Sequence, residues 1–381
     1  MRVQVIDPSA YTPPYDHALC AALARAGADV ELVTSRFAYG AAPVPDGYRV
    51  NQLFYTHALG PPASRLRLAT KLAQHVPDMM ALRRHAEAAQ VAHFQWLAVQ
   101  PIDRYLLPRC PVVLTAHDLL PREPRPLQLS AQRRLYDAVD ALVAHSEYGR
   151  RRLVEGLDIP PEKVRVIHHG AFDFLTQLPG GGLPPELSEP GGGPVVLFFG
   201  LLRPYKGVDV LLEAWRSVAE AANGGVAKAA NGGAAELWIV GRPRMDIDRL
   251  RAHSPRAVRW VTRFVSESEL GACFRRADVV VLPYLSTERF DFSGVLATAM
   301  AFGKATVLSG VGGFPEVAAA GGAELVPAGD AAALGQALLA LVGDPGERER
   351  LAQAAREAAA GPYSWGRAAE LTLELYRELV T

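Results

Sequence analysis

The feature that most constrains the fold is an alternation of short apolar runs with helix-forming stretches along the whole chain. Each run is followed by a turn and by a stretch rich in Ala, Leu and Arg, which is typical of parallel β–α units. Most runs are apolar at nearly every position, which predicts strands buried on both faces. We therefore expect an α/β protein with two doubly wound, Rossmann-like parallel sheets. The runs lie at residues 3–6, 30–34, 91–96, 112–117, 141–146, 164–170, 195–200, 236–241, 257–264, 279–284 and 305–310.

A Gly- and Pro-rich stretch, LPGGGLPPELSEPGGGP, divides the chain near its middle. A length of 381 residues favours two domains. We predict a first domain over 1–177, a linker over 178–193 and a second domain over 194–361. A last helix over 362–381 is expected to pack back on the first domain. Such sheets bind ligands at the carboxyl ends of their strands, so we expect both domains to face a central cleft.

Composition excludes several classes of protein. The formal net charge is zero and 21% of the residues are charged, which gives no sign of a nucleic-acid partner. Cys20, Cys110 and Cys273 are far apart, which argues against a disulfide framework or a zinc site. The N-terminus has no leader pattern and no long apolar segment follows, so we expect a soluble, cytoplasmic protein.

Two cations follow the first strand of the second domain, in the sequence FFGLLRPYKG. Gly200 allows a sharp turn off the strand, and Arg203 and Lys206 come just before a predicted helix. Helix N-termini favour anions, and Arg and Lys both bind phosphate. The pattern predicts a diphosphate site, although two solvated loop cations at an ordinary turn would give the same residues.

A second anion site is predicted where Ser293, Gly294 and Val295 begin a helix. The backbone amides there could cradle phosphate, with the Ser293 hydroxyl as a cap or ligand. A plain helix cap is the alternative interpretation. Gly312 and Gly313 then provide a tight turn, with the Glu316 carboxylate near the same edge.

Polar residues also follow strands of the first domain. His117 and Asp118 come directly after an apolar run, where an imidazole could hydrogen-bond a substrate, although a lone His is more often structural. In the loop after the first strand, the acceptor-side candidates are Tyr11, Asp16 and His17. Asp16 is also a candidate cap for a helix that begins near it.

A basic segment over 64–89 combines cations with Leu and Met at partly helical spacing. It could lie on an anionic membrane. Pro77 is expected to break it into two pieces, so a solvated face over an ordinary core helix is equally open. Its cations are Arg65, Arg67, Lys71, Arg83 and Arg84.

Taken in order, five fragments of the chain resemble the retaining glycosyltransferases of family 4, which have the GT-B fold. They are T-x-H-D at 115–118, HSEYGRRRLVE with KVRVIHHGAFD, FFGLLRPYKGVDVLLEAW, ADVVVLPY and AMAFGKATVLSGVGGFPEV. The third contains the G-x-x-R-P-Y-K-G pattern of one subgroup.

The resemblance implies a nucleotide-diphosphate sugar, of UDP or GDP type, bound mainly by the second domain. The first domain would hold a glycan, lipid-linked or small-molecule acceptor. Arg203 and Lys206 would bind the diphosphate and His117 would reach the reacting sugar. The donor site would also include Gly200, Arg263, Phe264, Ser293, Gly294, Val295, Leu296, Thr298 and Glu316.

The chain departs from the family pattern at several positions. Leu201 stands where the family usually has its arginine, which displaces that role to Arg203. Two glutamates that normally bind sugar and ribose hydroxyls are replaced by Phe290 and Thr298. Glu288 or Asp291 could substitute for the first, and the Thr298 hydroxyl could reach the ribose. Pro13 and Pro14 replace a glycine pair and stiffen the acceptor-side loop.

We therefore expect a retaining glycosyltransferase that needs no metal and no other cofactor. It would act in cell-surface polysaccharide or glycoconjugate synthesis, in the cytoplasm or at the inner face of the membrane. One alternative is a non-catalytic sugar-nucleotide-binding partner of a transferase. Another is an epimerase or a phosphorylase on the same fold. A dehydrogenase fits less well, because no G-x-G-x-x-G follows the first strand.

Overall fold

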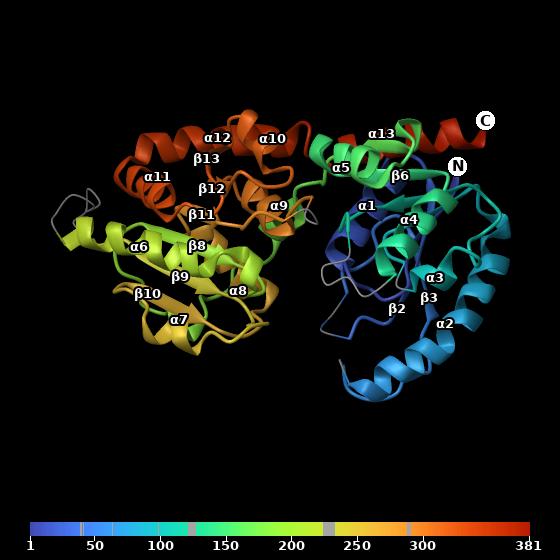
Figure 1. The fold of residues 1–381 in the computed structure, drawn as a ribbon, viewed down its shortest axis with the longest axis horizontal. Coiled ribbons are helices and arrows are strands. Elements are labelled where there is room, and N and C mark those ends of the chain that lie inside the picture. Colours follow the sequence, from blue (N-terminus) through green and yellow to red (C-terminus); the bar gives the residue numbers. More distant parts are fainter. Residues whose placement is uncertain are drawn as a thin grey trace. The chain divides into compact units, whose positions relative to one another are not determined.

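The chain folds into two compact units. The computed structural model describes residues 1–381 except 39, 41, 63, 98, 121–126, 224–232 and 288–290. Unit 1 comprises Met1–Gly170, Glu288–Asp291 and Pro362–Thr381, and unit 2 comprises Ala171–Thr287 and Phe292–Gly361 (Figure 1). The C-terminal helix is thus part of unit 1, and the Gly- and Pro-rich stretch is part of unit 2.

Unit 1 is built on a 7-stranded parallel sheet with the order β3-β2-β1-β4-β5-β6-β7. Its central strands are buried along their length, as their apolar sequences predict. The edge strand β3 was not predicted, because its sequence RVNQLF is polar and half-exposed. The strands are β1 (Arg2–Asp7), β2 (Asp29–Ser35), β3 (Arg49–Phe54), β4 (Val91–Phe94), β5 (Val112–Thr115), β6 (Ala141–Ala144) and β7 (Val164–Val166).

Helices connect these strands and pack on the sheet. The first, α1, begins at Pro13 rather than near Asp16, because proline is favoured in the first turn of a helix, where its missing N–H has no partner to lose. The helices are α1 (Pro13–Arg25), α2 (Arg65–His85), α3 (Gln100–Asp103), α4 (Gln128–Ala138), α5 (Glu147–Leu157) and α13 (Trp365–Val380), with 3-10 turns η1 (Ala86–Ala88) and η2 (Pro161–Lys163).

The helix α2 continues through Pro77, so the predicted break is wrong. Proline removes one backbone hydrogen bond, to the carbonyl of Ala73 four residues earlier. Both Ala73 and Pro77 are exposed, so water can satisfy this carbonyl. The opposite face of α2 is anchored by His75, whose Nε2 lies 2.5 Å from Asp103 Oδ1 and whose Nδ1 lies 2.7 Å from Tyr55 Oη.

The C-terminal helix α13 packs against α1 in unit 1 (Figure 1). Its Tyr376 hydroxyl lies 2.6 Å from Nδ1 of His93, on the central strand β4. At its start, Trp365 lies over Gly170, where an added Cβ would come within 2.3 Å of the indole ring. Position 170 therefore requires glycine, because any side chain there would collide with the Trp365 indole.

Unit 2 is built on a 6-stranded parallel sheet with the order β10-β9-β8-β11-β12-β13. The edge strand β13 was not predicted, because two exposed residues interrupt its short sequence AELV. The other strands match the predicted runs. They are β8 (Val195–Phe199), β9 (Glu236–Val240), β10 (Val258–Val261), β11 (Val279–Leu282), β12 (Ala305–Ser309) and β13 (Ala323–Val326).

The core of unit 2 lies between this sheet and its helices, where Leu211, Trp215 and Val218 of α6 are fully buried. The helices are α6 (Val208–Asn223), α7 (Asp248–Ala252), α8 (Glu267–Arg276), α9 (Gly294–Ala301), α10 (Phe314–Ala319), α11 (Ala331–Gly343) and α12 (Pro345–Ala360), with 3-10 turns η3 (Asp173–Gln177), η4 (Pro185–Leu187) and η5 (Pro204–Lys206).

The stretch that we predicted as a linker packs on unit 2. Leu187 is fully buried, and Nη2 of Arg259 on β10 donates hydrogen bonds to the carbonyls of Glu186 and Ser188 at 2.9 and 2.7 Å. This Gly- and Pro-rich stretch is therefore an ordered segment that packs against β10 of unit 2.

Candidate active site

The strand order of unit 2 reverses between β8 and β11, so the carboxyl ends of these strands form a switch point of the kind where α/β proteins bind ligands. Gly200 follows β8 with a φ of +112°, a conformation that favours glycine. A Cβ on Gly200 would lie 2.9 Å from Nζ of Lys206 and 3.3 Å from Cγ2 of Val295. The structure thus brings the Gly200–Lys206 loop and the first turn of α9 together.

Two cations lie in this loop. Lys206 is only 8% exposed, and its Nζ lies 5.0 Å from the centre of the Tyr284 ring. Nε of Arg203 is buried and, among the described residues, has no hydrogen-bond partner. Because a buried donor without a partner is costly, this nitrogen favours an acceptor that the described residues do not supply.

Ser293 caps helix α9, as predicted. Its Oγ accepts a hydrogen bond from the Val295 amide at 3.3 Å and lies 3.2 Å from the hydroxyl of Tyr284. Thr298 is nearly buried, and its hydroxyl donates to the Gly294 carbonyl at 2.8 Å. The Thr298 hydroxyl, which we considered as a ribose ligand, therefore donates its proton within α9.

Arg263 and Phe264 follow β10, at the carboxyl edge of the same sheet. The Arg263 guanidinium binds two carboxylates, with Nε 3.0 Å from Glu186 Oε1 and Nη2 2.7 Å from Glu269 Oε1. It lowers the pKa of Glu269 to about 2. Phe264 is 55% exposed, and Glu316 lies in α10, after β12. The Arg263 side chain is therefore held by two acids, and its Nη1 also donates to the Phe264 carbonyl at 3.1 Å.

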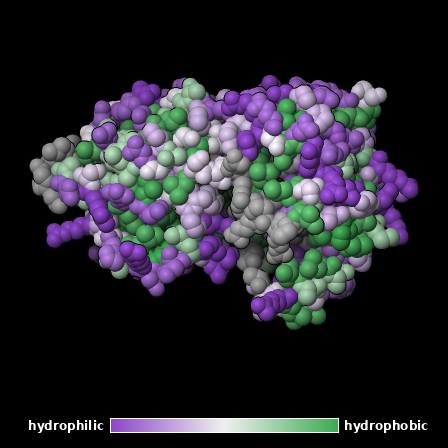
Figure 2. Space-filling view, viewed as in Figure 1, coloured by the Kyte–Doolittle hydropathy of each residue, from purple (hydrophilic) through white to green (hydrophobic). Residues whose placement is uncertain are grey.

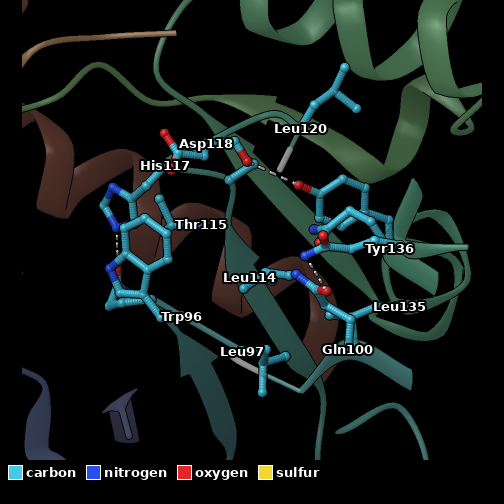
Figure 3. Close-up of a pocket in the computed structure, with 14 residues that line it drawn as sticks. Trp96, Leu97, Gln100, Leu114, Thr115, His117, Asp118, Leu120, Leu135 and Tyr136 are labelled. Atoms are coloured by element: carbon cyan, nitrogen blue, oxygen red, sulfur yellow. Dashed lines mark hydrogen bonds between the residues drawn. The ribbon is translucent and has the colours of Figure 1, made fainter. Parts of the chain in front are cut away.

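In unit 1, His117 and Asp118 line a cavity of about 300 Å³ at the carboxyl ends of β4 and β5 (Figure 3). The His117 ring stacks on Trp96, with ring centres 5.1 Å apart and planes within 17°. Nε2 of His117 lies 3.0 Å from Oε1 of Gln95, which is fully buried. Desolvation lowers the pKa of His117 well below its usual value, so the imidazole is neutral at pH 7.

Further histidines surround His117, and sequence analysis did not single them out. Burial lowers the pKa of His145 to about 4 and that of His169 to about 3. Tyr15 of α1 lies among these rings, with its centre 4.6 Å from His117, 5.4 Å from His145 and 4.9 Å from His169. His145 and His169 follow β6 and β7 as His117 follows β5, so polar residues just after parallel strands were the signal that could have found them.

The other acceptor-side candidates of unit 1 have separate surroundings. Asp16 is buried beside Asp7, and the two carboxyls share a hydrogen bond. Nδ1 of His17 lies 2.5 Å from the Tyr48 hydroxyl, and His17 and Asp16 line a different cavity from that of His117. Tyr11 is 61% exposed and packs edge-on against Trp96, at a distance of 5.5 Å between ring centres. Tyr11 therefore contacts Trp96, a residue that lines the His117 cavity.

Asp291 belongs to unit 1, although the next residue, Phe292, belongs to unit 2. Its fully buried carboxylate accepts hydrogen bonds from the His145 amide, at 2.7 Å, and from the Ser146 hydroxyl. An added Cβ on Gly149, in the first turn of α5, would lie 2.6 Å from this carboxylate. The carboxylate thus stabilises the start of α5, and its contact with a sugar stays a prediction. The other candidate substitute, Glu288, lies outside the described residues, as does Phe290.

The chain contains one Asp-x-Asp spacing, at Asp246 and Asp248. Both residues are exposed, and Oδ1 of Asp246 accepts a hydrogen bond from the Asp248 amide at 3.0 Å, at the start of α7. Within the described ranges, no group of three His, Cys, Asp or Glu side chains gathers as metal ligands would. This spacing therefore serves a local turn.

Two parallel, doubly wound α/β units with polar residues at their strand ends define an architecture that many classes of enzyme share, and sequence comparison identifies the family. Residues 193–344 match the profile described as glycosyl transferases group 1, and residues 15–171 match that of glycosyltransferase family 4. Alpha-maltose-1-phosphate synthase of Mycolicibacterium smegmatis is 30% identical over 77% of this chain and 80% of that protein. D-inositol 3-phosphate glycosyltransferase of Kineococcus radiotolerans is 29% identical over 95% of this chain and 89% of that protein.

Solved structures share the fold. Sucrose-phosphate synthase from Thermosynechococcus elongatus superposes with a TM-score of 0.72 at 19% identity, covering 100% of this chain and 99% of that one. Anabaena HepE, in complex with UDP-glucose, gives a TM-score of 0.68 at 18% identity, covering 99% and 100%. The chain belongs to the glycosyltransferases of family 4 and has their two-domain, Rossmann-like GT-B fold.

Proposed function

We propose that this glycosyltransferase moves a sugar from a nucleotide-diphosphate sugar, of UDP or GDP type, to a hydroxyl of a glycan, glycolipid or small acceptor. We further propose that it retains the anomeric configuration, needs no metal and acts in cell-surface polysaccharide or glycoconjugate synthesis. The names of its relatives support the transferase activity, and HepE, solved with UDP-glucose, supports the donor class.

The observation that carries the donor assignment is the loop after β8. Nε of Arg203 is buried and has no hydrogen-bond partner in the described part of the chain, Lys206 is nearly buried, and the capped start of α9 lies beside them. Two cations and a helix N-terminus at one switch point fit the oxygens of a diphosphate.

The chemistry follows from these charges. As the glycosidic bond breaks, the sugar gains oxocarbenium character and the diphosphate gains negative charge. Arg203, Lys206 and the α9 amides would stabilise the leaving diphosphate. A diphosphate oxygen on the same face would then take the proton of the acceptor hydroxyl, which gives retention without a carboxylate nucleophile. Neutral His117 would hydrogen-bond the reacting sugar.

A thermal-shift panel of UDP, GDP, ADP and their sugars tests the donor site. A ligand at 100 times its dissociation constant stabilises the protein by about 2.7 kcal/mol. Lys206→Met should abolish most of this shift, whereas Lys304→Met should keep it, because Nζ of Lys304 donates to the Arg275 carbonyl away from the switch point. No shift with any nucleotide, or equal shifts in the two variants, would contradict the donor assignment.

Turnover then tests the reaction. Loss of an interaction with the leaving group costs about a hundred- to a thousandfold in kcat, which is the loss expected for Lys206→Met. Proton NMR of the first product formed reports whether the anomeric configuration is retained. Activity that EDTA abolishes and Mg²⁺ restores would contradict metal independence.

One observation favours a second candidate, a sugar-nucleotide-binding protein without catalysis. The described residues that could replace the missing glutamates, Asp291 and Thr298, both have their oxygens in hydrogen bonds within the protein. Donor binding with no turnover by any acceptor, in a protein that shows the nucleotide-dependent thermal shift, would support this candidate.

We also propose that the protein acts in the cytoplasm, with α2 resting on the inner face of an anionic membrane. Leu68, Leu72, Val76 and Met80 recur every four residues on α2 and are 60, 53, 36 and 46% exposed. Figure 2 shows hydrophobic side chains on the surface over this helix. No helix in the described ranges is long and apolar enough to cross a membrane, so any contact of these helices would be at the surface.

Not all the cations of this segment can face a lipid surface. Nζ of Lys71 donates to Ser9 Oγ at 3.1 Å and lies 4.3 Å from the centre of the Tyr55 ring. Arg65 and Arg84 remain exposed at the two ends of α2. The apolar row, more than the charge, therefore supports the membrane proposal.

A further inference from the structure

The loops that follow β8 and β9 run side by side beyond the ends of these strands. The Leu202 amide donates to the Arg242 carbonyl at 3.1 Å, and the Arg244 amide donates to the Leu202 carbonyl at 2.9 Å. Leu202 and Pro243 thereby form a parallel β-bridge. The pairing of the two strands therefore continues into the loops, and it places Arg242 beside the segment that leads to Arg203 and the switch point.

A close backbone contact fixes the position of Arg242. Gly241, the residue before it, lies so close to the end of β8 that an added Cβ would be 1.8 Å from the Gly200 carbonyl oxygen. The Gly241 amide also donates to the carbonyl of Val261, the last residue of β10, at 2.8 Å. Arg242 therefore begins its loop between the carboxyl ends of β8 and β10, and sequence analysis did not single it out.

The Arg242 guanidinium lies over the ring of Phe264, which follows β10. Its Cζ is 5.3 Å from the ring centre, within the range of a cation–π contact. Both side chains are exposed, Phe264 by 55%. The neighbouring Arg263 holds this loop in place through its two carboxylate partners and the Phe264 carbonyl. An exposed aromatic ring and an exposed cation are thus presented together at the ligand-binding edge of the sheet.

Resting on the proposed transferase function, we propose that Phe264 and Arg242 bind the base of the donor nucleotide, and that Arg242 selects a keto base of uracil or guanine type over an amino base. An aromatic ring can stack on any base, so Phe264 contributes affinity without selection. A guanidinium only donates hydrogen bonds. O4 of uracil and O6 with N7 of guanine accept them, whereas the amino groups of cytosine and adenine donate and would face Arg242 without pairing. The neighbouring Arg263 is unsuited to this role, because its guanidinium is committed to two carboxylates.

Matched nucleotides test the proposal. UDP and CDP differ by a keto oxygen or an amino group at one ring position, and IDP and ADP differ in the same way at the position of guanine O6. Calorimetry gives the dissociation constants of these four and of inorganic pyrophosphate, which has no base. In the pair that binds more tightly, which shows whether the base is a pyrimidine or a purine, we expect the keto member to bind at least about tenfold better. Equal binding within that pair, or tighter binding of its amino member, overturns the proposal.

Variants assign the selection to Arg242. In Arg242→Met the preference for the keto member should fall below about threefold with pyrophosphate binding unchanged, because a thioether offers no donor. Phe264→Leu should weaken both members equally, and Arg249→Met, exposed on α7, should change none of the constants. A preference that survives in Arg242→Met overturns the proposal, and so does an equal loss of pyrophosphate binding, which would make Arg242 a phosphate ligand. An unmodified protein that binds neither nucleotides nor pyrophosphate would overturn the donor assignment itself, and the base site with it.

Discussion

Nε2 of His145 lies 3.4 Å from Nδ1 of His117. Nδ1 of His145 is 2.9 Å from the Ile167 carbonyl, which can only accept, so this nitrogen carries the proton. With its pKa lowered to about 4, His145 is neutral at pH 7 and Nε2 is an acceptor. Nδ1 of His117 then donates to it, which leaves Nε2 of His117 as a lone-pair acceptor facing Gln95. A flip of the Gln95 amide turns its NH₂ toward this lone pair.

We predict that His145 positions His117 by fixing its tautomer. Asparagine at position 145 can still donate to the Ile167 carbonyl but has no acceptor where Nε2 lies, whereas glutamine places an oxygen there. His145→Asn should lower kcat by about ten- to a hundredfold with the donor KM unchanged, from the loss of one buried hydrogen bond, and His145→Gln should restore most of it. The ¹⁵N shifts of the His117 ring report the tautomer directly. Equal losses in both variants, with unchanged ¹⁵N shifts, would assign His145 a packing role only.

The buried pair of Asp7 and Asp16 should make stability fall as pH rises. Desolvation raises the pKa of both carboxyls, and the neighbouring Asp7 charge raises that of Asp16 further. A group with a raised folded pKa contributes stability below its unfolded pKa of about 3.9, and this contribution is lost as pH rises through the folded pKa. Asp16→Asn should therefore stabilise the protein at pH 8 by about 1 to 3 kcal/mol.

Asp7→Asn is the matched control for this experiment. The Asp7 carboxylate accepts hydrogen bonds from the amides of Ser9, Tyr11 and Thr12, so an amide in its place should destabilise the loop after β1. Urea midpoints at pH 5 and pH 8 measure both effects. A destabilised Asp16→Asn variant at pH 8 would show that the Asp16 carboxylate is needed as an anion.

The buried histidines should have the opposite effect in acid. Burial lowers the pKa of His93 and His169 to about 3 and that of His145 to about 4, and lowers that of His117 as well. In the unfolded chain each histidine titrates near 6.5, so the stability of the neutral forms is complete above that pH and is lost as pH falls toward 4. In an Asp16→Asn background, the urea midpoint should drop between pH 7 and pH 5.

Substitution of single histidines checks this assignment. His169→Gln should make the drop smaller, because it removes one of the proton-binding groups. His253→Gln should not change it, since His253 is exposed on unit 2. An unchanged pH dependence in His169→Gln would mean that other groups cause the acid sensitivity.

Local pattern predicted most of the fold. Apolar runs identified the buried strands, but β3 and β13 lie at sheet edges, where half-exposed residues remove that signal. The helix start at Ser293 was predicted from capping chemistry and is confirmed. The predicted break at Pro77 was wrong because the cost of a helical proline depends on whether water reaches the freed carbonyl, which the sequence does not show.

The candidate site was predicted residue by residue but not as a network. Position after a strand was enough to select Lys206 and His117. The hydrogen bond between Ser146 and Asp291 joins residues 145 positions apart, and no local pattern predicts such a pairing. The tautomer of His117 likewise depends on the backbone carbonyl of Ile167. Every residue has such a carbonyl, so the sequence carries no signal for this hydrogen bond.

The apolar row on α2 should decide membrane binding. Burying Leu68 and Leu72 in the interface stabilises the bound state, so Leu68→Ser with Leu72→Ser should abolish flotation with anionic liposomes, while folding and the nucleotide thermal shift are kept. Leu325→Ser is the matched control, because Leu325 is 42% exposed and belongs to unit 2, whereas α2 belongs to unit 1. Flotation should weaken in uncharged liposomes, since Arg65 and Arg84 add about 1 kcal/mol each near an anionic surface. An unmodified protein that stays with the aqueous fraction, or a double variant that floats as well as it does, would contradict the membrane proposal.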